Sequence, residues 1–242
     1  MNAPQVCVAC KLPAEELVPH WAGLNRCPRC GHCVADIDFE AFDPKSLYGP
    51  GYFKGDAYLD YSKDREVLEK HFKKKLAFVL RHVSGGRLLE IGSAYGYFLA
   101  LARERFDVVG FEVSEEAARY ARGELNLDVR SESLEAKAVP NGSFDCVVMW
   151  DVIEHLARPD LTVQTAGAAL RPGGMLFLTT GDIESWLARL RKGKWRLIHP
   201  PTHLHYFTRR SLDALLSGVG MQVVECRHTG VRRSLRQMIY SV

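Results

Sequence analysis

The sequence predicts an α/β protein with a doubly wound, mostly parallel sheet, preceded by a small cysteine-bearing module. Three observations support this. Apolar, strand-like runs alternate with helical segments from residue 87 onward. A glycine-bearing turn follows the first of these runs. Two C-x2-C pairs stand near the N-terminus, apart from the alternating pattern.

The period of the apolar residues changes along the chain and gives the order of the elements. We expect strands at 87–92, 107–113, 127–131, 144–150, 175–180 and about 222–228. We expect helices from about 62 to 84 and near 96–105, 114–124, 159–170 and 208–218. Ligands bind at the carboxyl ends of strands in such sheets, so the candidate site residues should gather at that edge.

Composition excludes several classes of protein. The chain has 242 residues, of which 47% are hydrophobic and 25% charged, as in an ordinary globular protein. A formal charge of +3, from 32 basic and 29 acidic residues, is too small to indicate nucleic-acid binding. No apolar run reaches the roughly 18 residues of a membrane span, and residues 1–5 do not resemble a signal peptide. We therefore expect a cytoplasmic protein without a membrane span.

Four cysteines carry the spacing of a zinc ribbon. Cys7, Cys10, Cys27 and Cys30 form two C-x2-C pairs separated by 16 residues, and such pairs bend into knuckles that share one tetrahedral zinc ion. Reduced thiols or disulfides are the alternative.

Three other cysteines and a histidine are left out of this zinc site. His32 and Cys33 lie close by in sequence, but four cysteines already complete a structural site. Cys146 and Cys226 lie within predicted strands, where a free cysteine is usually a small buried apolar residue.

The turn after the first strand is suited to a nucleoside. Gly92 and Gly96 allow the backbone to pass close to a ligand, and Glu112 at the end of the next strand supplies a carboxylate for a ribose diol. The pattern is E-x-G-x-x-x-G, whereas a dinucleotide turn has G-x-G-x-x-G. A neutral or cationic nucleoside therefore fits better than a dinucleotide.

Together with the blocks at 144–156 and 170–178, this turn resembles the class I S-adenosylmethionine-dependent methyltransferases, which have a Rossmann-like fold. The resemblance runs from about Leu88 to the C-terminus. It implies that Glu112 binds the ribose hydroxyls, that Ser133 and Leu134 flank the adenine, and that Gly92 passes the methionine part. The full set of implied cofactor residues is Glu90, Gly92, Ser93, Gly96, Phe98, Glu112, Val113, Ser133, Leu134, Trp150 and Asp151. Relatives usually add one more strand at the end, so we expect a truncated chain.

The methyl acceptor is expected to meet two segments. Asp151, Glu154 and His155 should share one face of a helical turn, and His203 lies in a later loop. The first group resembles the acid-x-x-Glu-His cluster of ubiquinone-biosynthesis O-methyltransferases and small-RNA 2′-O-methyltransferases, where a divalent ion holds a diol. Asp151 stands where those enzymes usually have Glu.

Three readings of these catalytic candidates stay open. Magnesium or manganese could be bound there, His203 or His205 could act as a general base, or Glu154 and His155 could be purely structural. The other histidines, His20, His71, His82, His199 and His228, are assigned to the surface or to packing.

The expected domains are a zinc ribbon (1–40), an aromatic-rich connector with an N-terminal helix that could form a lid (41–84), and the methyltransferase core (85–242). The connector's tyrosines suit either a lid over the site or packing of the ribbon on the core.

The segment 201–207 resembles one found in bacterial zinc-ribbon methyltransferases presumed to act on glycans or small metabolites. This implies O-methylation of a small-molecule or sugar-like hydroxyl. An RNA methyltransferase, and a non-catalytic binding module on a degenerate fold, are the alternatives. The low net charge and the absence of an Asn/Asp-Pro-Pro-Tyr block argue against nucleic acid as a partner.

Overall fold

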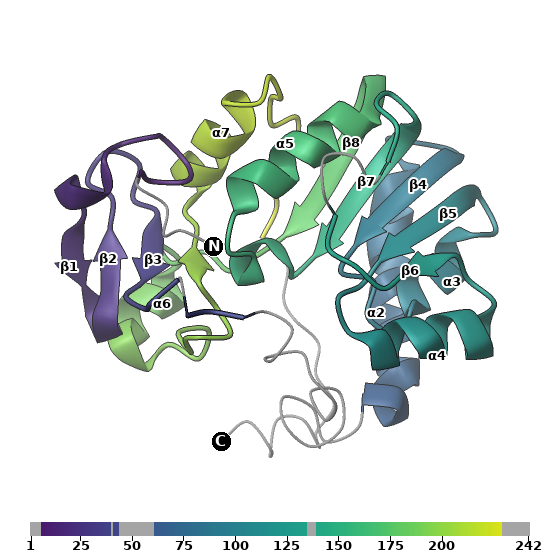
Figure 1. Cartoon of the computed structure of the whole chain (residues 1–242), viewed down its shortest axis with the longest axis horizontal. Coiled ribbons are helices and arrows are strands. Elements are labelled where there is room, and N and C mark those ends of the chain that lie inside the picture. Colours follow the sequence, from purple (N-terminus) through teal and green to yellow (C-terminus); the bar gives the residue numbers. More distant parts are fainter. Residues whose placement is uncertain (1–5, 40, 44–60, 135–138, 229–242) are drawn as a thin grey trace. The chain divides into compact units, whose positions relative to one another are not determined.

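The computed structural model describes residues 6–39, 41–43, 61–134 and 139–228. The chain forms two compact units (Figure 1). The first comprises Met1–Asp43, Trp150–Gly167 and Leu178–Cys226, and the second Pro44–Met149, Ala168–Phe177 and Arg227–Val242. Each unit thus draws on segments far apart in sequence, and the boundaries proposed from the sequence at residues 40 and 84 stay a prediction.

Most of the second unit is a five-stranded sheet with the order β6-β5-β4-β7-β8. Its strands are β4 (Gly86–Ile91), β5 (Phe106–Phe111), β6 (Val129–Arg130), β7 (Phe144–Trp150) and β8 (Leu170–Thr179). The pairs β4–β5, β4–β7 and β5–β6 are parallel. The predicted fold class is confirmed, and the predicted strand 144–150 coincides with β7.

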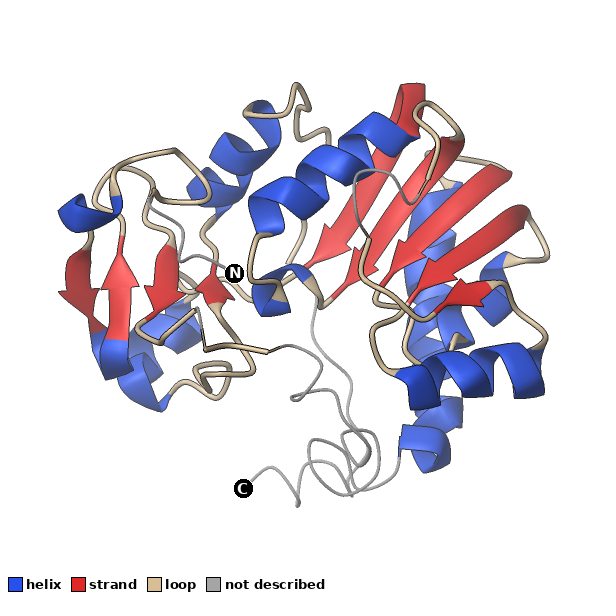
Figure 2. Ribbon diagram, in the orientation of Figure 1, coloured by secondary structure: helices blue, strands red, loops and turns tan. Residues whose placement is uncertain are grey.

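Burial explains why the strands of this sheet read as continuous apolar runs. The first six residues of β7 are all buried, as are the last four of β4. Parallel strands covered on both faces are mostly apolar at consecutive positions, here with Asp145 and Glu90 as exceptions, and helices flank this sheet (Figure 2).

The helices of the second unit begin and end at capping residues. They are α2 (Arg65–Leu80), preceded by the 3-10 turn η4 (Tyr61–Asp64), α3 (Tyr97–Ala102) and α4 (Glu115–Leu125). Ser114 is the N-cap of α4, acidic Glu115 and Glu116 occupy its first turn, and Asn126 ends it in the left-handed conformation. The helix predicted to run from about 62 to 84 spans Arg65–Leu80, so it ends earlier than expected.

Strand β8 begins five residues earlier than predicted. The segment Arg171-Pro172-Gly173-Gly174 suggests a turn, yet it lies within the strand. β8 is the last strand in the sheet order, and proline is tolerated on an edge strand because no neighbour needs its missing N–H.

The first unit contains a second sheet, with the order β1-β2-β3-β9 (Figure 1). Its short strands are β1 (Val18–His20), β2 (Leu24–Arg26), β3 (Cys33–Ala35) and β9 (His205–Tyr206), all paired antiparallel. The register pairs Cys33 with Tyr206 and Val34 with His205. A strand from late in the chain therefore completes the sheet of the cysteine-bearing module.

The remaining elements of the first unit are α5 (Pro159–Ala169), which continues into the second unit, α6 (Trp186–Arg191), α7 (Arg209–Ser217), η1 (Ala14–Glu16), η2 (Trp21–Gly23), η5 (Ile153–His155) and η6 (Lys192–Lys194). Leu24, Ala35, Trp195 and Tyr206 are among the buried residues that form a common core here. This core joins β2, β3 and β9 to the segment after α6.

The strand predicted at 222–228 is wrong. Residues 221–228 belong to no strand, although their side chains alternate between exposed and partly buried as far as Cys226. Alternating exposure shows only which side of an extended segment is covered. A strand also needs hydrogen bonds to a neighbouring strand. Cys226 is consequently exposed rather than buried, while Cys146 in β7 is buried as predicted.

Within the described part of the chain, each helix is too short or too polar to span a lipid bilayer.

Candidate functional site

The turn between β4 and α3 is built as a nucleoside-binding turn requires. Gly92 and Gly96 have φ values of 72° and 81°, in the left-handed region that favours glycine. The N–H groups of Gly92 and Ser93 both donate to the carbonyl of Phe111, at 2.8 and 3.1 Å. The turn is therefore fixed against the end of the neighbouring strand β5.

The space beside Gly96 is occupied by the protein's own side chains. A Cβ there would lie 2.6 Å from Leu127 Cδ1 and 3.1 Å from Ala121 Cβ. The space that Gly96 leaves open is thus filled by the protein's own side chains, and this glycine serves helix packing as well as the turn.

Glu112 holds the turn from the end of β5. Its Oε2 accepts from the Ala94 N–H at 2.7 Å and its Oε1 from the Ser114 N–H at 2.8 Å. A carboxylate has about four acceptor sites, so Glu112 keeps capacity to receive hydroxyl groups of a ligand. Burial raises the pKa of Glu112, while these N–H groups lower it.

Two buried polar atoms lie beside Glu112 without a partner. Glu90 Oε2 and Ser93 Oγ have no hydrogen bond within the described residues. Burial raises the pKa of Glu90 well above its usual range, opposed by the charge of Lys75 and reinforced by Glu112. Unpaired buried polar atoms are costly, so this turn is suited to a ligand that donates hydrogen bonds or carries positive charge.

The other predicted cofactor residues fall into three groups. Phe98 is buried and packs edge-on against Phe72, with ring centroids 5.8 Å apart, which is a core position. Val113 is partly buried, Leu134 is buried and Ser133 is exposed. Trp150 and Asp151 belong to the first unit.

A cluster of tyrosines beside the turn was not predicted from the sequence. Tyr95 and Tyr97 are buried, and the ring of Tyr120 on α4 stacks on Tyr95 at 4.4 Å. Arg65 of α2 lies over the Tyr97 ring at 5.5 Å. The tyrosines weighed instead as a lid, at 48–61, lie outside the described residues apart from the last. The spacing of 25 residues between Tyr95 and Tyr120 carries no local signal that could have revealed the pair.

The four predicted zinc ligands converge in the first unit. Cys7, Cys10, Cys27 and Cys30 offer sulfur atoms that all lie within 4.8 Å of one another. Sγ of Cys7 is 3.7 Å from that of Cys30, and Sγ of Cys10 is 3.5 Å from that of Cys27. Disulfide sulfurs are about 2.05 Å apart. Thiolates around zinc, with bonds of about 2.3 Å in a tetrahedron, are about 3.8 Å apart.

Each cysteine pair forms a knuckle with the same backbone pattern. The N–H of Lys11 donates to the Cys7 carbonyl and that of Gly31 to the Cys27 carbonyl, both at 2.9 Å. Lys11 and Gly31 both have positive φ, 61° and 78°. A hydrogen bond from Cys30 lowers the pKa of Cys7 to about 3, so one thiolate is already favoured.

Two histidines lie next to the cysteine site, one in contact with a cysteine and the other in contact with the first histidine. His32 Nδ1 is 3.8 Å from Cys7 Sγ, and His32 Nε2 is 3.1 Å from His205 Nδ1. Burial lowers the pKa of His205 to about 3. These contacts disfavour His205 as a general base, because the ring is enclosed and bonded to His32. The β3–β9 pairing brings the segments that carry His32 and His205 together.

Glu154, His155 and His203 form a second cluster in the first unit. Their potential ligand atoms lie within 4.8 Å of one another. The rings of His155 and His203 meet edge-on with centroids 4.5 Å apart. The Leu204 N–H donates to the Glu154 carbonyl at 2.8 Å, which fixes the 199–204 loop against η5.

Backbone carbonyls set the tautomers of both rings. His155 Nδ1 lies 2.8 Å from the Thr202 carbonyl and His203 Nδ1 lies 2.9 Å from the Leu197 carbonyl. A carbonyl only accepts, so each Nδ1 carries the proton and each Nε2 keeps its lone pair. Burial lowers the pKa of His155 to about 4 and that of His203 to about 2.

Asp151 does not join this cluster. It has a φ of 57°, is exposed, and its Oδ1 accepts from Thr179 Oγ1 at 2.8 Å. The shared helical face predicted for residues 151, 154 and 155 fails because η5 begins only at Ile153. His199, assigned to the surface from the sequence, is exposed but packs on His203 with ring centroids 3.9 Å apart.

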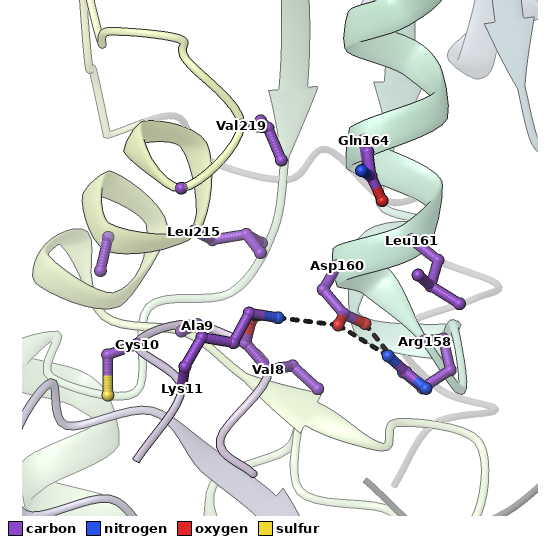
Figure 3. A pocket seen from close by; sticks show the side chains of 12 residues that line it. Val8, Ala9, Cys10, Lys11, Arg158, Asp160, Leu161, Gln164, Leu215 and Val219 are labelled. Atoms are coloured by element: carbon purple, nitrogen blue, oxygen red, sulfur yellow. Dashed lines mark hydrogen bonds and ion pairs between the residues drawn. The ribbon is translucent and has the colours of Figure 1, made fainter.

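The first unit also has a cavity of about 590 Å³ between the first knuckle, α5 and α7 (Figure 3). Asp160 is paired there with Lys11 and Arg158, each at 2.9 Å. Although burial opposes it, these bonds lower the pKa of Asp160 to about 2. The Lys11 contact ties the first knuckle to the start of α5.

The sequence is similar to those of known methyltransferases. Residues 61–226 match the family described as methyltransferase domain. A ubiquinone biosynthesis O-methyltransferase of Mesorhizobium japonicum is 31% identical over 79% of this chain and 80% of its own length. Another from Sinorhizobium fredii is 29% identical over 79% and 80%. The match to the Sinorhizobium medicae protein, at 33% identity, spans only 58% of either chain.

Solved structures show the same fold. A SAM-dependent methyltransferase of Thermotoga maritima is 26% identical, with a TM-score of 0.54 over 66% of this chain and 76% of its own. One from Archaeoglobus fulgidus, at 19% identity, has a TM-score of 0.53 over 74% of each chain.

Proposed function

Because this chain belongs to the methyltransferase-domain family and is an S-adenosylmethionine-dependent methyltransferase, we propose that it methylates a hydroxyl group of a small molecule. The observation that carries the proposal is the cluster of Glu154, His155 and His203. The curated relatives, which are named ubiquinone biosynthesis O-methyltransferases, support oxygen as the acceptor atom.

We propose that the turn after β4 holds the cofactor. Glu112 would accept the ribose hydroxyls, since its carboxylate is already aimed at the turn by Ala94 and Ser114. The unpaired atoms of Glu90 and Ser93 suit the charged methionine end and its sulfonium. S-Adenosylmethionine thus fits the chemistry of these residues.

Cofactor affinity should depend on pH. The pKa values of Glu90 and Glu112 are raised by burial, and a cationic ligand prefers both groups ionised. We therefore expect affinity to be highest where both groups are ionised and to fall as pH is lowered through their raised pKa values. Calorimetry from about pH 8 to about pH 5 measures this.

The Glu90→Gln variant provides the comparison, because glutamine stays neutral throughout and should show a shallower pH dependence. Wild-type affinity that stays constant down to about pH 5 would contradict the expectation.

We propose that the Glu154 cluster binds the acceptor. One carboxylate and two imidazole Nε2 atoms are a donor set for a divalent ion, and two imidazole ligands favour a transition-metal ion over magnesium. Manganese is the weakest-binding of these ions and serves as the probe. A bound ion would make an acceptor hydroxyl more acidic. The low pKa values of His155 and His203 make either ring a weak proton acceptor, which favours ligation over general-base catalysis.

The reaction is a displacement at the sulfonium methyl. The acceptor oxygen forms a bond to the methyl carbon, the carbon–sulfur bond breaks with its electron pair going to sulfur, and the hydroxyl proton passes to solvent water. S-Adenosylhomocysteine is the second product. Because the cofactor is already activated, the protein's main contribution is alignment of oxygen, carbon and sulfur.

Glu154→Ala and His203→Ala should abolish the divalent site. We expect each to weaken manganese binding by at least about tenfold, since each removes a ligand. Calorimetry with manganese on the zinc-loaded protein measures this, alongside S-adenosylhomocysteine release with a panel of small phenols and diols. His228→Ala, at an exposed position, is the control.

If His203 were instead a base, manganese affinity would be unchanged in His203→Ala while turnover fell. Near wild-type turnover and manganese binding in both variants would remove this cluster from the proposed mechanism.

We also propose that the four cysteines hold a structural zinc ion. The separation of their sulfurs and the two matched knuckles support a tetrahedral thiolate site.

A further inference from the structure

Helix α6 turns its apolar side chains outward. Trp186, Leu187 and Leu190 are 75%, 41% and 70% exposed. At about 100° per residue these three positions fall within an arc of about 100° on one side of the helix. Ala188 projects from the other side, is fully buried, and packs in the core that contains Ile183. A helix on a protein surface normally buries its apolar side.

Cationic residues surround this apolar face. Arg189 and Arg191 flank it on the two sides of α6, and Lys192 and Lys194 follow in η6. All four are exposed, and none has an ion-pair partner among the residues that the structure describes. The stretch 185–196 contains no Asp or Glu. The combined surface is called the α6 patch.

The fold holds the α6 patch in place. The side chain of Ser185 caps the helix by accepting from the Ala188 N–H at 3.3 Å. Beyond the helix, Trp195 is buried in the same core as Ala188. Gly193 lies against Ala22 of η2, where an added Cβ would be 3.3 Å from the Ala22 Cβ. The residues before and after α6 are therefore packed, and they hold its apolar face toward the outside.

We propose that the α6 patch docks on an anionic phospholipid surface, with Trp186, Leu187 and Leu190 in the interface and the cations on the headgroups. Tryptophan favours the membrane interface, and an apolar face rimmed by Lys and Arg is typical of helices that lie in it. A second copy of the chain would bring like charges together. Nucleic acid would match the cations but leave the leucines uncovered. The proposal does not depend on the identity of the methyl acceptor.

The test is co-sedimentation of the full, zinc-loaded chain with vesicles. Binding is expected with vesicles of equal parts phosphatidylglycerol and phosphatidylcholine, and little with phosphatidylcholine alone. Trp186→Ser and Leu190→Ser should each weaken binding about tenfold, because a large apolar side chain leaves the interface. Lys192→Gln and Lys194→Gln should each cost about fivefold and reduce the salt dependence.

Val224→Ser is the matched control, since Val224 is exposed but lies outside the α6 patch. It should bind vesicles as the wild type does. Tryptophan emission should shift to the blue on binding, and Trp186→Phe should remove most of that shift. Unchanged melting temperatures would confirm that the variants are folded.

Failure of the wild type to bind anionic vesicles at low salt would overturn the proposal. So would binding that needs the lysines but is indifferent to Trp186→Ser and Leu190→Ser, because that pattern indicates a polyanion such as nucleic acid.

Discussion

Replacing Glu112 by alanine is expected to weaken S-adenosylmethionine binding at least about 100-fold, because hydrogen bonds to a charged group contribute about 1.5–3 kcal/mol each. The variant loses both proposed ribose contacts. It also frees the N–H groups of Ala94 and Ser114, which the carboxylate now holds at 2.7 and 2.8 Å. The turn itself should therefore loosen. Calorimetry with the cofactor and with S-adenosylhomocysteine measures the loss.

Glu115→Ala is the matched control for this prediction. Glu115 lies three residues further on, at the exposed start of α4, and pairs with Arg122 at 2.9 Å. Its loss should leave cofactor affinity within about twofold of the wild type, since surface ion pairs contribute little. Equal affinities for wild type and Glu112→Ala would show that this carboxylate does not contact the ribose.

Replacing Cys27 by serine is expected to release one zinc ion per chain and to abolish methyl transfer while leaving cofactor binding largely intact. Structural zinc in small modules contributes about 10–16 kcal/mol of apparent binding free energy, so its loss should unfold the β1-β2-β3-β9 sheet. Strand β9 begins two residues after His203, so the proposed acceptor cluster should be lost with that sheet. The cofactor turn belongs to the other compact unit.

Elemental analysis, calorimetry with the cofactor and turnover measure these three effects. Cys33→Ser is the control, because Cys33 is as buried as Cys27 but lies outside the group of four sulfurs. It should keep its zinc. A wild-type protein that purifies without metal, with all four thiols open to titration, would overturn the zinc assignment.

The sequence predicted the structure best where a structural element depends only on consecutive residues. The run Leu88–Phe98 specifies a strand, a turn and a helix, and β7 is apolar apart from Asp145 because both faces of the sheet are covered. The two knuckles were also readable, since each depends on four or five consecutive residues. Predictions failed where an element needs a neighbour, as at 222–228, because the pattern of one segment cannot show whether a partner strand is present.

By itself, then, the sequence determined the fold class, the methyltransferase family and the four converging cysteines, because each rests on local spacing. Only the tertiary structure decided which histidines act together. His205 was a candidate base but lies behind the cysteine site against His32, and His203 joins Glu154 and His155 while Asp151 does not. The reason is that the β3–β9 pairing and the carbonyls of Leu197 and Thr202 orient these rings. Such contacts join residues far apart in sequence, as His32 and His205 are at 173 positions.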